Sequence, residues 1–412
     1  MRGTRMLAGA LGVERAVIED VREEDGVGFV VRVRPRREHR RRCPHCLARC
    51  PGYDGGDGLR RWRTHDVGLV RAFIEAAAPR VRCAEHGVVV AHVPWARHGS
   101  GFTQSFEDTV AWLAVRTDKT ALSSLLRIAW RSVGAIVERV CESATAARPP
   151  LAGVTRIGID EVSYRKGHRY LTCVIDHDTG RLLWAQPGRD EKTLRKFFRL
   201  LGKEGRAAIS LVSADAATWI GNVVREQCPG AALCIDPFHV VSWATRAVDD
   251  VRRGLWNELR ERGQTERAKA MKGSRWALVK NPEDLTRKQK RKLRAIEEDN
   301  QRLFRAYLMK EQLREIFRTK GWVAVFMLDE WLAWIGHSKI EPMKKVARAI
   351  REHRVGIDAA LVFGLSNARL EAANTKLKLL TRLAFGFHSH APLVALAMLK
   401  LGGLCPPLPQ AA

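Results

Sequence analysis

The sequence lacks an apolar segment suited to crossing a membrane. Its longest run without Asp, Glu, Lys or Arg, Leu383 to Leu399, has 17 residues and includes His388, Ser389 and Pro392. That run is short and too polar for a bilayer span. The residues after Met1 also lack the sustained apolar stretch of a secretory signal peptide. We therefore expect no membrane partner.

Acidic residues and paired cysteines are also scarce. Asp and Glu number 45 against 71 Lys and Arg, which gives a formal charge of +26 and favours a polyanionic partner. Arg34–Arg42 holds six Arg, and Arg287–Arg294 is a second basic run. The nine Cys are odd in number and scattered, so we expect a reducing cytosol rather than a disulfide framework. A 46% apolar content and 12 Trp indicate folded cores, not a basic tail.

Four metal-capable residues near the N-terminus stand in two pairs of equal spacing. They are Cys43 and Cys46, followed after 36 intervening residues by Cys83 and His86. Each pair can supply two ligands from a tight turn, so together they predict a tetrahedral, structural Zn²⁺ site. The spacing leaves three competing ligands open: His45, Cys50 and His65. Such a site would stabilise the strands expected at 27–34 and 69–82, because these strands bury little surface by themselves.

Residues 102–140 have a helical pattern. Three helices are expected near 104–116, 119–127 and 130–140. This arrangement is typical of a helix-turn-helix with 130–140 as recognition helix, although a plain three-helix connector also fits. Ala144 to Pro150, with its paired Pro, is typical of a linker.

From residue 154 onward, short apolar segments alternate with turn signals. The expected elements are strands at 154–162, 170–177 and 182–187, a helix at about 190–202, a strand ending at Asp215, a helix through Arg225 and a strand at 231–236. Asp178-Thr-Gly180 is a tight hairpin signal between the second and third strands. Three antiparallel strands followed by alternating helices and strands is the element order of a ribonuclease-H-like α/β domain.

Two carboxylates end apolar runs of this sheet. Asp160 closes Ile-Gly-Ile, and Asp215 closes Ile-Ser-Leu-Val-Ser-Ala. Asp is a common turn former, so either residue alone could simply end a strand. In a ribonuclease-H-like sheet, however, the first and fourth strands are neighbours. The two side chains would then face each other, which is costly for two anions unless cations lie between them.

A third carboxylate lies on a helix far downstream. One face of that helix carries Asn367, Glu371, Asn374 and Lys378, beside an apolar face of Leu370, Ala373, Leu377 and Leu380. A solvated charged face is the ordinary explanation for such a pattern. Two Asn beside one Glu favour a functional face, because Asn is a poor helix former.

Four motifs of this region form a specific combination. They are Gly158-Ile-Asp160-Glu161, Arg165-Lys166-Gly167-His-Arg-Tyr170, Asp236-Pro-Phe-His239, and the series Asn367, Glu371, Asn374, Lys378, Arg382, Gly386-Phe387. With these motifs the chain resembles, over essentially its whole length, an insertion-sequence transposase of the ISL3 family with an Asp-Asp-Glu catalytic domain. Family members commonly carry a second CxxC, so His86 is a small departure; His is also a good zinc ligand.

The resemblance implies DNA cleavage and strand transfer by two-metal displacement at phosphorus. Asp160, Asp215 and Glu371 would hold two Mg²⁺ (or Mn²⁺) ions, because oxygen ligands suit these ions. Arg165 and Lys166 are candidates for phosphate contacts, with an ordinary surface role equally open. The implied partner is double-stranded DNA, as terminal inverted repeats and as target, bound by a homodimer or higher oligomer at the nucleoid in a bacterial cytoplasm.

The second carboxylate has an alternative. Asp236 also ends a strand, within the Asp-Pro-Phe-His motif, and could stand in place of Asp215. In related transposases the acid on the fourth strand is the metal ligand. We therefore choose Asp215. The supporting or alternative residues are Asp236, His239, Asn374 and Lys166.

Two other classes of function share parts of this pattern. An inactive, transposase-derived DNA-binding regulator could keep the fold without the activity, but an intact acid set argues against decay. A ribonuclease-H-like nuclease would share the chemistry. The zinc module and helix-turn-helix disfavour it, because they suggest recognition of a defined duplex end.

The expected organisation has five parts. They are a zinc-binding module (1–100), a helix-turn-helix domain with linker (101–150), the first part of the catalytic domain (151–239), an all-α insertion (240–365) and the C-terminal part of the catalytic domain (366–412). The insertion accounts for the 155 residues between Asp215 and Glu371. Six Trp of this region are expected to be mostly core: Trp243, Trp256, Trp276, Trp322, Trp331 and Trp334.

Overall fold

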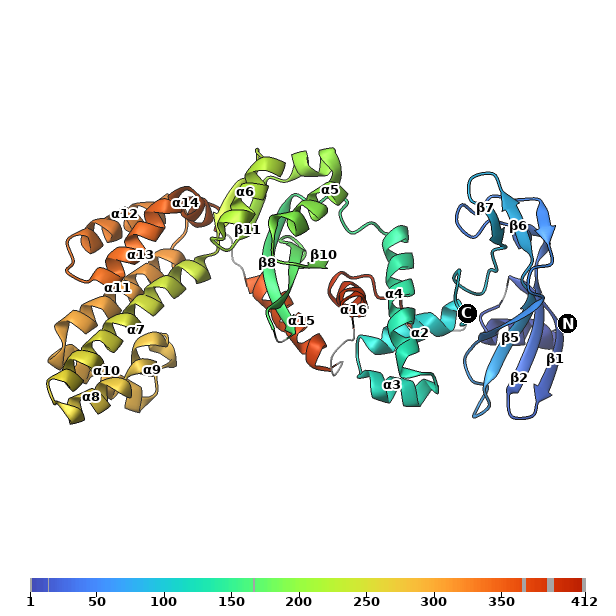
Figure 1. The fold of residues 1–412 in the computed structure, drawn as a ribbon, viewed down its shortest axis with the longest axis horizontal. Coiled ribbons are helices and arrows are strands. Elements are labelled where there is room, and N and C mark those ends of the chain that lie inside the picture. The colour runs from blue at the N-terminus through green and yellow to red at the C-terminus, as the bar shows by residue number, and fades with distance from the viewer. Residues whose placement is uncertain (1, 14, 166, 365–367, 384–388, 410–412) are drawn as a thin grey trace. The chain divides into compact units, whose positions relative to one another are not determined.

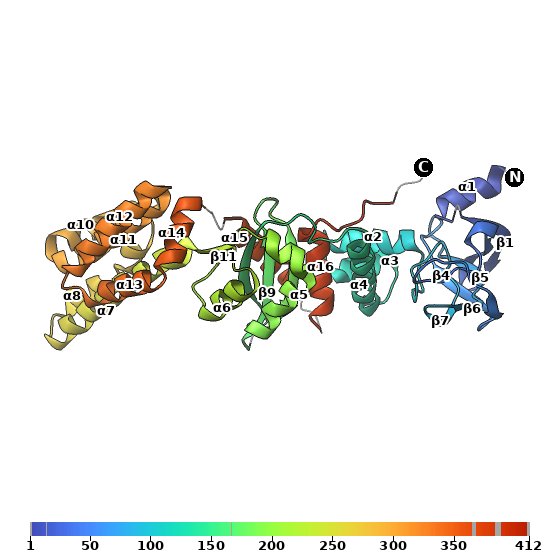
Figure 2. The same ribbon diagram turned by 90° about the horizontal axis from the view of Figure 1, so that it is seen from above.

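The computed structural model describes residues 2–13, 15–165, 167–364, 368–383 and 389–409. The chain forms two compact units, one of Met1–Pro150 with Leu379–Ala412 and the other of Leu151–Lys378 (Figures 1 and 2). The chain passes back from the second unit to the first inside helix α15 (Ala368–Leu383).

The first unit begins with a β-rich part. Its elements are α1 (Arg2–Ala10), β1 (Ala16–Glu24), β2 (Gly28–Pro35), β3 (Gly52–Asp54), β4 (Leu59–Arg63), β5 (Ala72–Ala77), β6 (Arg80–Cys83) and β7 (Gly87–Val90). One sheet has the order β1-β2-β5-β4 and a smaller one the order β3-β6-β7. The strand expected at 69–82 is therefore two strands in different sheets. Pro79 separates them, because it has no amide hydrogen to continue a ladder.

Three helices follow, close to the expected positions: α2 (Gln104–Ala114), α3 (Lys119–Leu126) and α4 (Trp130–Ala147). The side chain of Thr103 caps α2 by accepting a hydrogen bond from the Phe106 amide, and Asp118 caps α3 in the same way. Arg127 takes a left-handed conformation (φ 52°) in the turn before α4. Helix α4 runs seven residues beyond the expected 140, into the predicted linker, and ends before Pro149, which disfavours helix in the residue that precedes it.

The last helix, α16 (Ala391–Leu401), packs against α4 and α2 of the first unit. Gly134 of α4 faces the Pro392 ring, and a Cβ there would lie in ordinary van der Waals contact with it, at 3.4 Å. Residues 379–412, which we expect to belong to the C-terminal part of the catalytic domain, group by their contacts with the first compact unit. The apolar residues Leu393, Leu396 and Leu399 of α16 are buried.

The second unit is built on a five-stranded sheet of order β10-β9-β8-β11-β12. The strands are β8 (Arg156–Arg165), β9 (Arg169–Asp176), β10 (Leu182–Pro187), β11 (Leu211–Ala214) and β12 (Ala232–Ile235). β8 pairs antiparallel with β9 and parallel with β11, which pairs parallel with β12. The expected neighbourhood of the first and fourth strands is thus present, as β8 beside β11.

The two faces of this sheet carry different helices. Ile157 and Ile159 of β8 pack with α5 (Glu191–Ala208) and α6 (Thr218–Gln227) in one core. Because side chains alternate along a strand, Asp160 points to the other face, where it meets α15. Helix α5 extends beyond the expected end at 202. Gly202 there has a non-helical φ of 73°, and the helix resumes after it.

Between β12 and α15 the described residues form only helices and one short 3-10 turn, as expected for 240–365. The helices are α7 (Pro237–Glu261), α8 (Thr265–Lys272), α9 (Arg275–Val279), α10 (Arg287–Asp299), α11 (Gln301–Arg318), α12 (Trp322–Gly336), α13 (Glu341–Glu352) and α14 (Arg354–Phe363). Trp331 lies fully in their core and donates its indole N–H to the Met309 carbonyl. The expectation for the other Trp was partly wrong, because Trp276 and Trp322 are 56% and 75% exposed.

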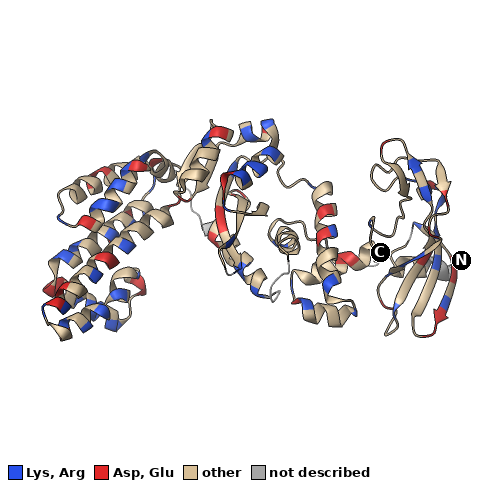
Figure 3. Ribbon diagram, in the orientation of Figure 1, with Lys and Arg blue, Asp and Glu red and all other residues tan. Residues whose placement is uncertain are grey.

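The remaining expectations concern cysteine, membrane spans and charge. All nine Cys are free thiols. Within the described ranges no helix is long and apolar enough to cross a bilayer. Lys and Arg occur throughout both units, for example along α5, rather than in one tail (Figure 3).

Candidate functional site

Three aspartates meet at the carboxyl edge of the parallel strands. Ser213 pairs with Gly158, so Asp215, two residues after Ser213, comes level with Asp160. Ala214 pairs with Ile235, so Asp236 comes level with Asp215. Carboxyl ends of parallel strands are where α/β sheets commonly bind ligands. The register of β8, β11 and β12 therefore gathers a row of three acids from distant parts of the sequence.

Asp160 is half-buried and lies on the strand nearest to α15. Its carboxylate accepts hydrogen bonds from the Glu161 amide, at 2.7 Å, and from the side-chain amide of Asn374. Burial raises the pKa of Asp160, and the negative charge of Asp215 raises it further, whereas His239 opposes the shift. A carboxyl that is desolvated beside a second acid is a site where a cation would be stabilised.

Asp215 and Asp236 both directly follow strands, β11 and β12, but differ in their surroundings. Asp215 accepts a hydrogen bond from the Ala217 amide at 3.0 Å and is partly exposed. Asp236 is buried, caps α7 through the Phe238 amide, and has its second oxygen 3.7 Å from His239 Nε2. One oxygen of Asp236 thus caps α7 and the other faces the His239 imidazole. These contacts suit a residue that supports the neighbouring acids rather than one that binds a ligand itself.

Helix α15 brings Asn374 to Asp160 and carries Glu371 one turn earlier. Glu371 is exposed. Arg369, two residues before it, donates hydrogen bonds to the carbonyls of His177 and Asp178, which fixes the start of α15 on the β9–β10 hairpin. Four predicted motif residues lie outside the described residues: Lys166, Asn367, Gly386 and Phe387.

The acids are near one another but do not converge on one point. Among the described residues, the only group of three or more His, Cys, Asp or Glu whose ligand atoms lie within 4.8 Å of one another is a Cys/His cluster in the first unit. Asp160, Asp215 and Glu371 are not drawn together to that degree.

The sequence pattern places Glu161 in a motif without indicating its role, and it gives no signal for Arg189. The side chain of Glu161 is only 6% exposed, and Arg189 Nε lies 3.2 Å from its carboxylate. Burial, followed by the charge of Asp215, raises the pKa of Glu161. The Arg189 guanidinium also sits 5.1 Å from the ring centre of Tyr170. A buried Glu inside a strand is unusual, and that signal could have identified the residue.

Arg189 is placed by a tight turn between β10 and α5. Gly188 has a φ of 129°, and a Cβ there would meet the Thr193 hydroxyl, so only glycine fits. The Arg189 side chain is 49% exposed. It therefore presents N–H groups to solvent at the rim of the acid row. The exposed Arg165, predicted as a phosphate contact, lies at the end of β8.

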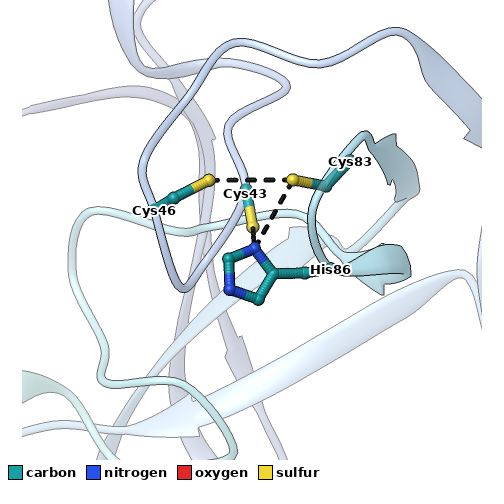
Figure 4. A group of neighbouring side chains, drawn as sticks. All are labelled: Cys43, Cys46, Cys83 and His86. Carbon is teal, nitrogen blue, oxygen red and sulfur yellow. Dashed lines mark hydrogen bonds between the residues drawn. The ribbon is translucent and has the colours of Figure 1, made fainter.

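The first unit holds the predicted zinc ligands in one cluster (Figure 4). Cys43 Sγ and Cys83 Sγ lie 3.7 and 3.6 Å from His86 Nδ1, and Cys46 Sγ lies 3.7 Å from Cys83 Sγ. Zinc bonds of about 2.3 Å to sulfur and about 2.05 Å to nitrogen at tetrahedral angles require sulfur–sulfur distances of about 3.8 Å and sulfur–nitrogen distances of about 3.6 Å. The donor set and its spacing fit zinc.

Local backbone geometry explains why each pair can converge. Leu47 and Gly87, each directly after the second ligand of a pair, have left-handed φ values of 56° and 69°. These turns fold each pair back on itself. The hydrogen bond from His86 and nearby backbone amides lower the pKa of Cys83 to about 6, so the cluster favours a thiolate.

The three competing ligands are not members of this four-residue group, although Cys50 packs against Cys43 and Cys83. His45 stacks its ring on His86 at 4.9 Å, and His65 Nε2 pairs with the Thr109 hydroxyl. Cys50 is buried and donates its thiol to the Ala48 carbonyl. The structure thus brings together the four residues whose spacing predicted the site.

The helix-turn-helix is joined to the β-rich part by an ionic contact. Asp66, in the loop after β4, pairs with Arg63 and with Arg127 of the α3–α4 turn. Arg131, in the first turn of α4, is exposed, and Trp130 beside it lies 4.2 Å from the Lys119 ammonium. An exposed basic residue at the start of α4, the second helix of the α3–α4 helix-turn-helix, is suited to contacting base edges in a DNA groove.

Comparison with known families accounts for most of the chain. A family model of ISL3-type DDE proteins, described as a transposase, matches residues 157–396. A helix-turn-helix domain of transposase family ISL3 matches residues 91–141. A zinc finger of the transposases of IS204, IS1001, IS1096 and IS1165 matches residues 39–86. The three regions coincide with the acid row, helices α2–α4 and the Cys/His cluster.

Individual relatives agree. The chain is 50% identical to the transposase for insertion sequence element IS1557 of Mycobacterium tuberculosis, over 99% of this chain and 98% of that protein. It is 26% identical to the transposase for IS1001 of Bordetella parapertussis, over 84% of this chain and 85% of that protein. The first relative extends the similarity to nearly the full length of both chains.

Proposed function

The chain belongs to the ISL3 family of insertion-sequence transposases, and from that membership we propose that it cuts the ends of an insertion sequence and joins the resulting 3′-hydroxyls to target DNA. The observation that carries the proposal is the row of Asp160, Asp215 and Asp236 at the carboxyl edge of three parallel strands. A helix bearing Glu371 and Asn374 lies on the same face.

The second unit has the features of a ribonuclease-H-like catalytic domain. Three antiparallel strands come first, and β11 and β12 extend the sheet on the other side of β8. The helices between Pro237 and Phe363 would then be an insertion before the last catalytic helix. This assignment rests on strand order and on the position of the acids.

We assign Asp160, Asp215 and Glu371 as the residues that bind Mg²⁺ or Mn²⁺. Bound divalent cations would activate the attacking oxygen and stabilise the leaving oxygen in an in-line displacement at phosphorus. Carboxylate and amide oxygens are the donors that such hard cations prefer. The desolvated Asp160 and the buried side-chain oxygen of Asn374, which lacks a hydrogen-bond partner, fit this requirement.

Other residues would position the site and the DNA. Asp236 holds His239 in place at the start of α7 and supports the acid row. Arg189 and Arg165 are basic groups at its rim, suited to binding phosphates of the strand to be cut. We propose that Arg189 binds a phosphate beside the scissile bond, and that the ion pair with Glu161 orients the Arg189 side chain.

The first unit would select the DNA ends. Cys43, Cys46, Cys83 and His86 would bind one structural Zn²⁺ that stabilises the β-rich part. The helix-turn-helix would read the terminal inverted repeats through α4. Because an element has two ends to be processed together, we propose that a homodimer or higher oligomer forms on the DNA.

An inactive DNA-binding regulator and a ribonuclease-H-like nuclease are the alternatives. A strand-transfer assay separates them. The protein is incubated in Mg²⁺ with a duplex of the element's terminal repeat and a supercoiled target plasmid. Our proposal predicts nicks at the repeat boundary and repeat DNA joined to plasmid. Binding without cleavage would indicate a regulator, and cleavage without joining a nuclease.

A further inference from the structure

We propose that the side-chain oxygen of Asn374 is a further ligand for the divalent cation bound by Asp160. This role rests on the proposed function and adds a neutral donor to the set of acids. Its basis is the juxtaposition of a buried amide oxygen that lacks a hydrogen-bond partner with the half-buried carboxylate of Asp160.

The contacts of Asn374 are one-sided. Its amide nitrogen donates to Asp160, whereas its side-chain oxygen is buried without a hydrogen-bond partner. A buried oxygen without a donor is destabilising unless something binds it. In a site rich in carboxylates, a cation is the partner that satisfies the amide oxygen and the acid together.

Helix α15 explains why Asn374 stands at this place. Leu370, Ala373 and Leu377 are buried. Glu371 and Asn374 are three residues apart, so they lie one turn apart on a common side of the helix. Arg369 ties the same helix to the β9–β10 hairpin, which restrains its rotation. Asn374 is thus the α15 side chain that contacts Asp160, and Glu371 is next to it.

The chemistry of an amide suits this position. Three carboxylates already supply three negative charges for the proposed ions. An amide oxygen adds a ligand without adding repulsion between acids. The amide also carries a donor and an acceptor on one group. The same side chain can therefore keep its N–H hydrogen bond to Asp160 while its oxygen binds the cation.

The test is Mn²⁺ binding by full-length protein without DNA, measured by titration calorimetry. Asn374→Ala is compared with Asn374→Asp, which restores an oxygen, and with Asp160→Asn. Asn222→Ala is the matched control, because Asn222 is exposed on α6 and bonds to Arg225. We expect Asn374→Ala to weaken Mn²⁺ binding by about tenfold or more. Asn374→Asp should bind at least as well as the parent, and Asn222→Ala should be unchanged.

The outcomes distinguish this role from the proposed function. If Asp160→Asn weakens Mn²⁺ binding and Asn374→Ala does not, Asn374 is not a ligand although the metal site stands. If Asn374→Asp is as weak as Asn374→Ala, the amide N–H matters rather than the oxygen, and the role is again overturned. If Asp160→Asn binds Mn²⁺ like the parent, the proposed metal site itself fails. Thermal unfolding of each variant checks that it folds.

Discussion

Asn374 donates a hydrogen bond to Asp160 across 214 residues of sequence. This contact joins α15, which follows helices α7–α14, to β8, the first strand of the five-stranded sheet. It means that the second unit is complete only when the chain has passed through α7–α14 and returned to the sheet. A change in those helices that displaces α15 would therefore act on the acid row without touching it.

Arg189 gives a first prediction. Arg189→Ala should reduce end cleavage by about 10- to 100-fold, because a hydrogen bond to a charged group contributes roughly 1.5–3 kcal/mol. The slope of log binding constant against log salt should fall by about 0.9, the value for one lost phosphate contact. Gel-shift titrations over a salt series and a cleavage time course measure both effects.

A matched control is Arg195→Ala. Arg195 is also partly exposed and ion-paired, but with Glu191 and Glu226 of α5 and α6. It should change neither slope nor cleavage. If the double variant Arg189→Ala/Glu161→Gln recovers the parent's cleavage, Arg189 only neutralises Glu161 and does not contact DNA.

Zinc gives a second prediction. The purified protein should contain one zinc per chain by elemental analysis. Cys43→Ser should lose it and lower the thermal stability of the first unit, because structural zinc binding is coupled to folding. His86→Cys and Cys50→Ser should both keep it. Zinc that is lost from Cys50→Ser but kept in His86→Ala would place the fourth ligand elsewhere.

The helix-turn-helix gives a third prediction. Arg131→Ala should lower the preference for the terminal repeat over random duplex by about 5- to 100-fold, the range for a lost contact of roughly 1–3 kcal/mol to a base. Arg37→Ala, in the exposed basic run after β2, should weaken binding to both duplexes equally. Competition gel shifts measure the ratio. Equal losses on both duplexes for Arg131→Ala would show that α4 does not read sequence.

His177 gives a prediction on pH. Its Nε2 lies 2.6 Å from the Ser213 hydroxyl, and burial, together with the charge of Arg156, lowers its pKa. As pH falls below about 6.5, His177 is protonated in the unfolded chain before it is protonated in the folded protein. The folded protein therefore loses stability as pH falls from about 6.5 to the lowered pKa of His177. His177→Gln should lose less stability between about pH 7 and about pH 5. Denaturant unfolding at several pH values measures the difference, and identical pH profiles would contradict the assignment.

For physical reasons, the sequence predicted most of the strands and the clustering of Cys43, Cys46, Cys83 and His86. Apolar runs ending in Asp mark buried strands, and the spacing of Cys43, Cys46, Cys83 and His86 itself encodes the geometry of two turns. The sequence pattern also predicted helices throughout the region from α7 to α14. In each case the signal is local.

The contacts that were missed are not local. The pairing of Arg189 with Glu161 depends on the φ of Gly188 and on its packing against Thr193. The apolar face of α16 shows that this helix is buried, but periodicity does not say against which helices. The same limit explains the wrong expectation for Trp276 and Trp322. The sequence shows that these Trp lie on helices, but it does not show which positions of a helix a neighbouring element covers.

End cleavage in Mg²⁺ by four substituted proteins tests the central claim most directly. Asp160→Asn, Asp215→Asn and Glu371→Gln should each abolish cleavage of terminal-repeat duplex while binding it within a few-fold of the parent, because binding rests on Lys and Arg contacts. Asp236→Asn should retain measurable cleavage. If Asp215→Asn cuts like the parent and Asp236→Asn does not, the second carboxylate is Asp236. If all four cut like the parent, the acid row is not the catalytic site.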